Sequence, residues 1–182
     1  MTTTSGVELR IYRCPGPEQL RRLNIMLGED GLPMFARHGI EVLDAWSVAL
    51  GAATPVLAYL CPFPSLARRD AAWAAVDADD DWQKTKQRHA QGTGPLTSQL
   101  EFWWLTEATP LALPAGPGVA VDLLTSDGPL GGLAGQFDVV YGPAGRRLAF
   151  TAEGASVAAE AAGGRRVRMR RVAWSPAARP AG

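Results

Sequence analysis

The side chains that could do chemistry lie at alternate positions of the chain's extended segments. Arg10 and Tyr12 are two apart in the alternating run 7–12, and Asp44 and Trp46 are two apart in a later run. Because successive side chains of a strand point to opposite faces of a sheet, residues two apart share a face. The combined alternation predicts one mixed face with these charged and aromatic members: Arg10, Tyr12, Asp44, Trp46, Tyr59, Glu101 and Trp103.

The mixed face suits a ligand cavity, because such cavities have apolar walls and a few placed polar groups. The apolar half of the run 7–12 is then predicted to pack under helices. The residues expected to contact a substrate in the cavity are Val42, Trp46, Val48 and Trp103. The alternative is an interior filled by its own side chains, in which Arg10 pairs with Asp44 or Glu101.

The mixed face holds the groups that acid–base chemistry requires. Asp44 or Glu101 could act as the general base, since desolvation in an aromatic pocket raises the pKa of a carboxyl group. Arg10 could hold a substrate carboxylate or stabilise an enolate oxyanion, and Tyr12 or Tyr59 could donate a proton. These roles are sufficient for cyclisation, isomerisation or dehydration, and we expect no cofactor.

Histidine and acidic clusters give weaker signals. His38 titrates near neutrality and is a candidate base, but it directly precedes Gly39 at a predicted helix end, where capping of carbonyl groups explains it. The acidic run 77–81 is interpreted as helix N-caps, because it lacks the ligand spacing of a calcium loop. With only two histidines and no His/Cys cluster, we expect no metal site.

The first 108 residues predict the order β-α-β-β-α-β. Strands are predicted at 7–12, 40–50, 55–61 and 99–106. Helices are predicted at 18–37, with a break near Asp30, and at 66–89, where the acidic run interrupts the first helix and caps a second, short one. This order is that of the ferredoxin-like α+β fold, an antiparallel sheet with its helices on one face. The domain boundaries that we expect are 1–108 for this unit, 109–118 for a linker, 119–174 for a β-rich half and 175–182 for a tail.

The β-rich half has two interpretations. Predicted strands at 119–124, 137–141, 148–151 and 166–174, with a helix at 155–162, indicate a degenerate second repeat whose first helix has shrunk to 128–135. The alternative is a β-rich arm over the first half. An arm would leave the first sheet in need of a symmetric partner, so we expect a homodimer unless this half closes the barrel within one chain.

The composition excludes several classes of protein. The chain has 182 residues, is 47% apolar and carries no formal net charge, so no global field attracts it to nucleic acid or anionic lipid. No apolar run approaches the roughly 20 residues of a membrane span, and the N-terminus does not resemble a signal peptide. Two cysteines are too few for a disulfide scaffold. We therefore expect a cytoplasmic protein with no nucleic-acid or membrane partner.

Four short collinear motifs resemble the NIPSNAP family over about residues 7–108: the run 7–12, Gly31-Leu32-Pro33, Arg37-His38-Gly39, and Asp81-Trp82-Gln83 at the start of a helix. The resemblance implies a dimeric α+β barrel, in which two ferredoxin-like sheets enclose a cavity. Several relatives in the wider barrel superfamily catalyse cyclisation or cofactor-free oxygenation of polyketides.

From the mixed face and this resemblance we expect a cofactor-independent tailoring enzyme of bacterial secondary metabolism that acts on a hydrophobic, polyketide-like small molecule. A cofactor-free oxygenase that uses Trp46 and Tyr59 is one alternative. The other is a non-catalytic module that binds a ligand or serves as a scaffold.

Overall fold

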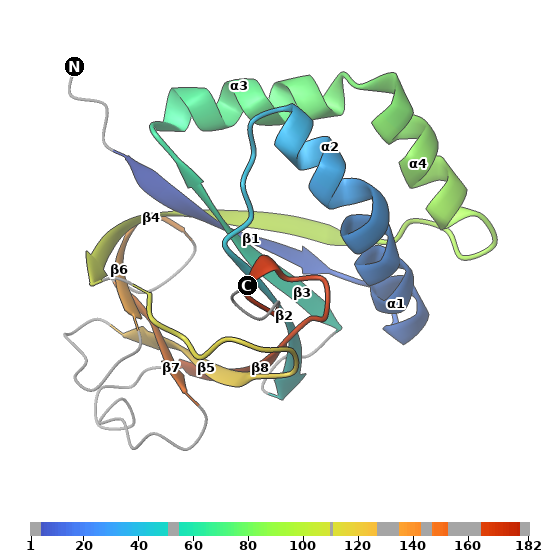
Figure 1. The fold of residues 1–182 in the computed structure, drawn as a ribbon. Helices are drawn as coiled ribbons and strands as arrows, with labels where there is room; N and C mark the ends of the chain where they lie inside the picture. Colours follow the sequence, from blue (N-terminus) through green and yellow to red (C-terminus); the bar gives the residue numbers. More distant parts are fainter. Residues whose placement is uncertain are drawn as a thin grey trace.

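The strands of the protein form one closed antiparallel barrel. The computed structural model describes residues 5–50, 55–109, 111–126, 135–142, 147–152 and 165–178. Among these residues eight strands close in the order β1-β3-β2-β8-β5-β7-β6-β4. The helices lie together on one side of β1, β3 and β4 (Figure 1). The predicted α+β barrel is therefore confirmed.

The first half has the predicted β-α-β-β-α-β order. Its elements are β1 (Gly6–Arg13), α1 (Pro17–Met26), a π-helical turn (Leu27–Gly31), α2 (Leu32–Arg37), β2 (Asp44–Leu50), β3 (Val56–Phe63), α3 (Leu66–Asp77), α4 (Asp80–Ala90) and β4 (Gln99–Thr109). The N-cap predicted in the acidic run is present, because Asp79 accepts from the amides of Asp81 and Trp82, and Ser65 caps α3 by accepting from the Arg68 amide.

The first helix is interrupted where the sequence predicts a break. The π-helical turn separates α1 from α2, and Gly28 lies there against Trp174, whose Cβ would be only 2.8 Å from a Cβ added to the glycine. Gly39, with a φ of 72°, ends α2 as expected. The predicted start of the second strand at Ile40 is wrong, because the Ile40 amide bonds to the Phe35 carbonyl of the helix and β2 begins at Asp44.

The second half repeats the strand order of the first. Its elements are β5 (Ala120–Ser126), β6 (Gly135–Tyr141), β7 (Arg147–Ala152), β8 (Arg165–Arg171) and a 3-10 turn (Pro176–Ala178). The order β8-β5-β7-β6 corresponds strand for strand to β4-β1-β3-β2. This correspondence supports the second-repeat interpretation over the arm. The predicted helix at 155–162 lies outside the described residues, as does 128–134 of the shrunken helix, and Gly135 belongs to β6.

Two seams join the halves, β2 with β8 and β4 with β6. The first half's sheet is therefore covered from within the same chain, without the symmetric partner that an arm would require. Arg168 of β8 bonds to Asp122 of β5 at 3.0 Å.

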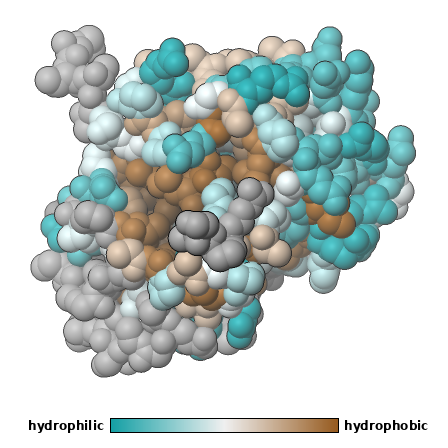
Figure 2. Space-filling view, in the orientation of Figure 1, coloured by the Kyte–Doolittle hydropathy of each residue, from teal (hydrophilic) through white to brown (hydrophobic). Residues whose placement is uncertain are grey.

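The buried apolar residues form two layers. One fills the barrel and includes Leu9, Trp46, Leu60, Trp103 and Phe150. The other lies between the sheet and the helices. Hydrophilic residues cover the outer surface of the helix layer, and hydrophobic residues gather between that layer and the strands (Figure 2). No helix among the described residues is both long and apolar enough to cross a membrane.

Candidate functional site

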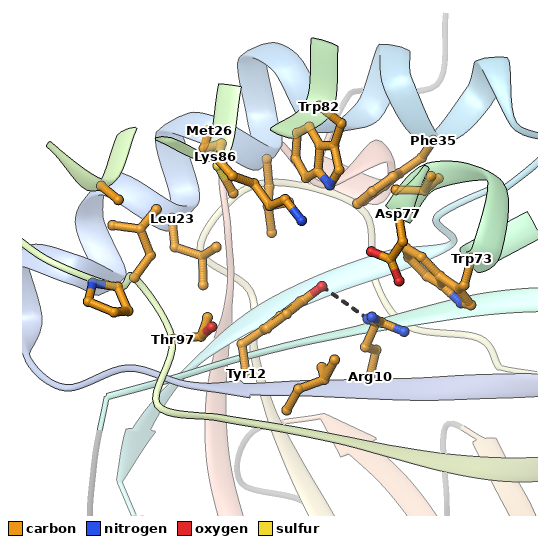
Figure 3. A pocket seen from close by; sticks show the side chains of 16 residues that line it. Arg10, Tyr12, Leu23, Met26, Phe35, Trp73, Asp77, Trp82, Lys86 and Thr97 are labelled. Atoms are coloured by element: carbon orange, nitrogen blue, oxygen red, sulfur yellow. Dashed lines mark hydrogen bonds between the residues drawn. The ribbon is translucent and has the colours of Figure 1, made fainter. Parts of the chain in front are cut away.

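A pocket of about 320 Å³ lies between the sheet and the helices, outside the barrel interior. Its floor is formed by side chains of β1 and its roof by the helices (Figure 3). The apolar residues that line it are Leu23, Met26, Leu27, Phe35, Trp73, Val76, Trp82, Ala90, Pro95, Leu96 and Leu100. Leu100 is 47% exposed, so the pocket reaches the surface beside the start of β4.

Five polar side chains line this pocket: Thr97 lies in the segment before β4, and the other four come from three elements. Arg10 and Tyr12 rise from β1, Asp77 ends α3, and Lys86 projects from α4 with its amine toward the pocket (Figure 3). Arg10 is buried, Lys86 is half-buried and Asp77 is exposed at the rim. Lys86 forms no ion pair or hydrogen bond with any described residue, so its ammonium group is available to a ligand.

A buried carboxylate holds the polar end of the pocket in place. Glu8 has no exposed surface and accepts from Arg10 Nη1 at 3.0 Å, from Arg69 Nε at 2.9 Å and from Trp73 Nε1 at 2.7 Å. The Arg10 guanidinium also lies 3.8 Å from the centroid of the Trp73 ring, a cation–π contact. The position of Arg10 is therefore fixed before any ligand arrives.

The charge of Arg10 persists in this setting. Burial alone would lower the pKa of Arg10, but the neighbouring Tyr12, Tyr59 and Glu8 raise it to well above its ordinary value. Glu8 faces two guanidinium groups, and one of them, Arg69, also pairs with the exposed Asp70 at 2.7 Å. Arg10 is the cation of this cluster that lines the pocket, where it favours an anionic or electron-rich group.

Tyr12 links the pocket to the buried Tyr59 of β3. Its hydroxyl oxygen accepts from Arg10 Nε at 3.0 Å and lies 3.1 Å from the hydroxyl of Tyr59. Tyr59 is fully buried, and burial raises the pKa of its hydroxyl well above the ordinary value. Tyr59 therefore remains a neutral phenol, and its hydroxyl reaches the pocket through Tyr12.

Comparison with known proteins agrees with this fold. Residues 7–106 match the profile of the NIPSNAP family, which is more than half of the chain. The chain belongs to the NIPSNAP family. The resemblance inferred from four short motifs is thereby confirmed.

Solved structures with a similar fold include other NIPSNAP proteins. A family member from Agrobacterium tumefaciens strain C58 is 23% identical, with a TM-score of 0.48, and the match covers 59% of this chain and 99% of that one. A NIPSNAP-like domain protein from Burkholderia xenovorans is 18% identical, with a TM-score of 0.49, over 60% of this chain and 90% of that one.

A third similar structure, from Lactobacillus acidophilus NCFM, carries a provisional description as a monooxygenase. It is 11% identical, with a TM-score of 0.48, and the match covers 92% of this chain and 77% of that one. Among curated proteins, no sequence matches this chain.

The prediction that seven charged and aromatic residues share one face is wrong for this NIPSNAP protein. Residues directly opposite one another in an antiparallel pair point to the same side of the sheet. Leu9 is opposite both Leu60 and Trp103, and Arg10 is opposite both Tyr59 and Phe102. The apolar half of β1 therefore fills the barrel, whereas its mixed half faces the helices, the reverse of the expectation.

The predicted site residues divide between the two sides of the sheet. Arg10 and Tyr12 line the pocket, and Tyr59 lies behind Tyr12. The residues Trp46, Val48 and Trp103 belong to the apolar layer of the barrel, and Val42 belongs to the layer under the helices. Trp46 and Tyr59 lie in different layers, so the pair suggested for oxygenation is not brought together.

The two carboxylates predicted as general bases have structural partners away from the pocket. Asp44 is 3% exposed and accepts from Arg171 Nε at 2.8 Å and from Ser175 Oγ at 2.7 Å. Glu101 pairs with Arg13 at 2.7 Å. Neither residue lines the pocket. The pairing of Arg10 with Asp44 or Glu101, which the filled-interior alternative proposed, is also wrong, since Arg10 pairs with Glu8.

The helical half of the pocket was missed from the sequence. Trp82 and Lys86 are four residues apart on α4, and residues at this spacing share a helix face. A lysine on the same face as a buried tryptophan was the signal that could have identified this wall. No group of histidine, cysteine or acidic residues within the described part of the chain could hold a metal ion.

Both ends of α4 are fastened by a histidine–aspartate pair. His38 Nε2 lies 2.9 Å from Asp79 at the start of α4, and His89 Nε2 near its end lies 2.9 Å from Asp30. His38, a candidate base, therefore contacts Asp79 in the helix layer and does not line the pocket. Trp82 is the one buried residue of α4, so apolar burial attaches this helix weakly. The two histidine–aspartate pairs therefore help to hold α4 in place as part of the pocket's roof.

Acid is expected to weaken this attachment. The hydrogen bond from His38 lowers the pKa of Asp79, and bonds from His89 and Arg88 lower the pKa of Asp30 despite an opposing effect of burial. A carboxylate with a lowered pKa stabilises the fold above its unfolded pKa, ordinarily 3.8, and this contribution is lost as the pH falls through the folded value.

The double variant Asp30→Asn/Asp79→Asn tests this prediction, since asparagine preserves the N-cap. The urea midpoint of the wild type should fall more than that of the variant between neutral pH and about pH 3. Equal decreases in the two proteins would contradict the role of these pairs.

Proposed function

We propose that this NIPSNAP protein binds a small amphipathic molecule, with an apolar body and an anionic or electron-rich head group, in the pocket under its helices. The observation that carries the proposal is the polar end of an otherwise apolar pocket, where Arg10 and the unpaired Lys86 converge. A volume of about 320 Å³ is at the lower end of the range of roughly 300–1,000 Å³ for small-molecule sites.

The test uses two probes that share a naphthalene ring system and carry opposite charges. The carboxylate 2-naphthoate should bind and change tryptophan fluorescence, because Trp73 and Trp82 line the pocket. The amine 2-naphthylmethylamine should bind at least about ten times more weakly, since it places a cation beside Arg10 and Lys86. Equal affinities for the two probes would contradict the proposal.

A substitution on α4 should weaken binding of the carboxylate. Lys86→Gln removes the ammonium that faces the pocket, and we expect a roughly 3–10-fold higher Kd for 2-naphthoate, a modest change because the group is half-buried. The matched control is Lys84→Gln on the same helix, whose side chain is 76% exposed and pairs with Asp81. Isothermal titration of both variants measures the difference, and an equal effect of the two substitutions would refute the role of Lys86.

Acid–base turnover is a second candidate function. It is favoured by the Asp77 carboxylate and the Tyr12 hydroxyl, a possible base and proton donor, which line the same pocket as Arg10. In this hypothesis Asp77 replaces Asp44 and Glu101 as the base. The chemistry would be a cofactor-independent cyclisation, isomerisation or dehydration of a polyketide-like molecule in bacterial secondary metabolism.

Proton exchange into a ketone tests for turnover without knowledge of the substrate. In D2O, the chelator-treated protein should accelerate deuterium incorporation into the methyl group of 2-acetonaphthone, followed by NMR. Asp77→Asn should abolish the acceleration and leave the binding of 2-naphthoate intact. Binding without exchange in the wild type would leave the non-catalytic ligand-binding module as the function.

A further inference from the structure

The hydrogen bond between Tyr12 and Tyr59 has a direction that its surroundings determine. Tyr59 is 0% exposed, and the Tyr12 oxygen, 3.1 Å away, is the one hydrogen-bond partner of its hydroxyl among the described residues. If Tyr12 donated, the buried Tyr59 proton would have no acceptor, an arrangement that proteins avoid. Tyr59 therefore donates and Tyr12 accepts.

A second donor fixes the direction of the Tyr12 proton. A guanidinium nitrogen can only donate, so Arg10 Nε gives its proton to the Tyr12 oxygen at 3.0 Å. The Tyr12 oxygen thus accepts two hydrogen bonds, which use both of its lone pairs. Its own proton cannot point at Tyr59 or at Arg10. Because Tyr12 lines the pocket, that proton is left for a group inside it (Figure 3).

Two of the groups that line the pocket with Tyr12 are also hydrogen-bond donors. Arg10 and Lys86 also reach the pocket, and both side chains are donors only. Asp77 is the acceptor of this group and is exposed at the rim. Apart from the Asp77 carboxylate and the Thr97 hydroxyl, the polar side chains that line the pocket therefore offer donors to a ligand.

We propose that Tyr59, from behind the pocket wall, sets Tyr12 as an obligate hydrogen-bond donor, so that the pocket selects ligands whose head group is an acceptor oxygen: a carboxylate, a ketone or an enolate. Tyr59 is a positioning residue, because it acts on the ligand through Tyr12. This inference rests on the proposed function and names the chemical class of its ligand.

Two neutral probes of nearly the same shape isolate the hydrogen bond from charge. 2-Acetonaphthone carries an acceptor oxygen where 2-isopropenylnaphthalene carries a CH2 group. The ratio of their affinities in Tyr12→Phe should fall by about 3–10-fold relative to the wild type, the value of one neutral hydrogen bond. In Tyr59→Phe, which keeps the ring, the ratio should fall by about 2–3-fold, since Tyr12 loses a donor that orients and polarises it.

Tyr141→Phe is the matched control, because Tyr141 is 63% exposed and does not line the pocket. Its affinity ratio should equal that of the wild type. If Tyr59→Phe weakens both probes alike and leaves the ratio unchanged, Tyr59 has a packing role and the proposal is overturned. An unchanged ratio in Tyr12→Phe would overturn it as well.

The direction of the bond can also be measured without a ligand. The chain has three tyrosines, so a tyrosine-labelled sample gives a simple NMR spectrum. We expect one slowly exchanging hydroxyl proton, coupled to the ring of Tyr59, because the Tyr12 proton faces an open pocket. A slowly exchanging proton on Tyr12 instead would overturn the proposal. If no probe binds the wild type, the proposed function fails, and this experiment still decides the direction of the bond.

Discussion

Glu8→Gln is expected to lower the free energy of unfolding by about 3–5 kcal/mol, the cost of leaving a buried charge without its partner. Glu8 is 0% exposed and is the carboxylate that faces both Arg10 and Arg69. Glutamine preserves the volume of the side chain but not its charge, so both guanidinium groups lose their buried counter-charge. Urea unfolding at neutral pH measures the change.

The loss should also be specific to the charge. The double variant Glu8→Gln/Arg69→Gln should lose less than the sum of its single variants, because it removes one of the two cations that Glu8 faces. Glu29→Gln, at an exposed position on the π-helical turn, is the control and should leave the urea midpoint unchanged. A loss for Glu8→Gln no larger than for this control would show that Arg10 is held by other contacts.

Asp44→Ala should destabilise the protein by a similar amount, about 3–5 kcal/mol, and should act on the seam between the two halves. Asp44 begins β2, and its partner Arg171 ends β8, so their ion pair crosses that seam. The Arg171 side chain is 1% exposed, and its Nη1 also donates to the carbonyls of Pro114 and Gly116. Loss of the carboxylate therefore leaves a buried cation that anchors three segments.

Hydrogen exchange should locate this effect. Amides of β8 and of residues 114–119 should lose protection more than those of β1 and β3, which pair within the first half. Asp138→Asn is the control, since the Asp138 side chain, which pairs with Arg147, is 50% exposed. Uniform loss of protection over the whole chain would indicate that the halves unfold as one unit and that the seam is not a weak point.

The sequence predicted local structure well because its signals are local. Alternation identified the first strand, His38 before Gly39 identified the end of the first helix, and the acidic run identified an N-cap. The β-α-β-β-α-β order followed from these elements, and the family followed from short motifs placed on them.

The site could be predicted only in part. Arg10 and Tyr12 were found because period two places both on one face of one strand. Period two does not say which side of the sheet that face covers, nor how the phases of different strands align. The pairing of Leu9 with Trp103 sets that alignment, and it depends on the register of two strands about ninety residues apart.

The sequence by itself therefore determined the elements, the ferredoxin-like first half and two residues of the pocket. Only the tertiary structure decided that the barrel is filled by apolar side chains, that the pocket lies under the helices, and that Asp44 belongs to a seam. It also decided that the second half closes the barrel. The physical reason is that register, helix docking and seam pairing depend on contacts between distant segments, which no local pattern of residues encodes.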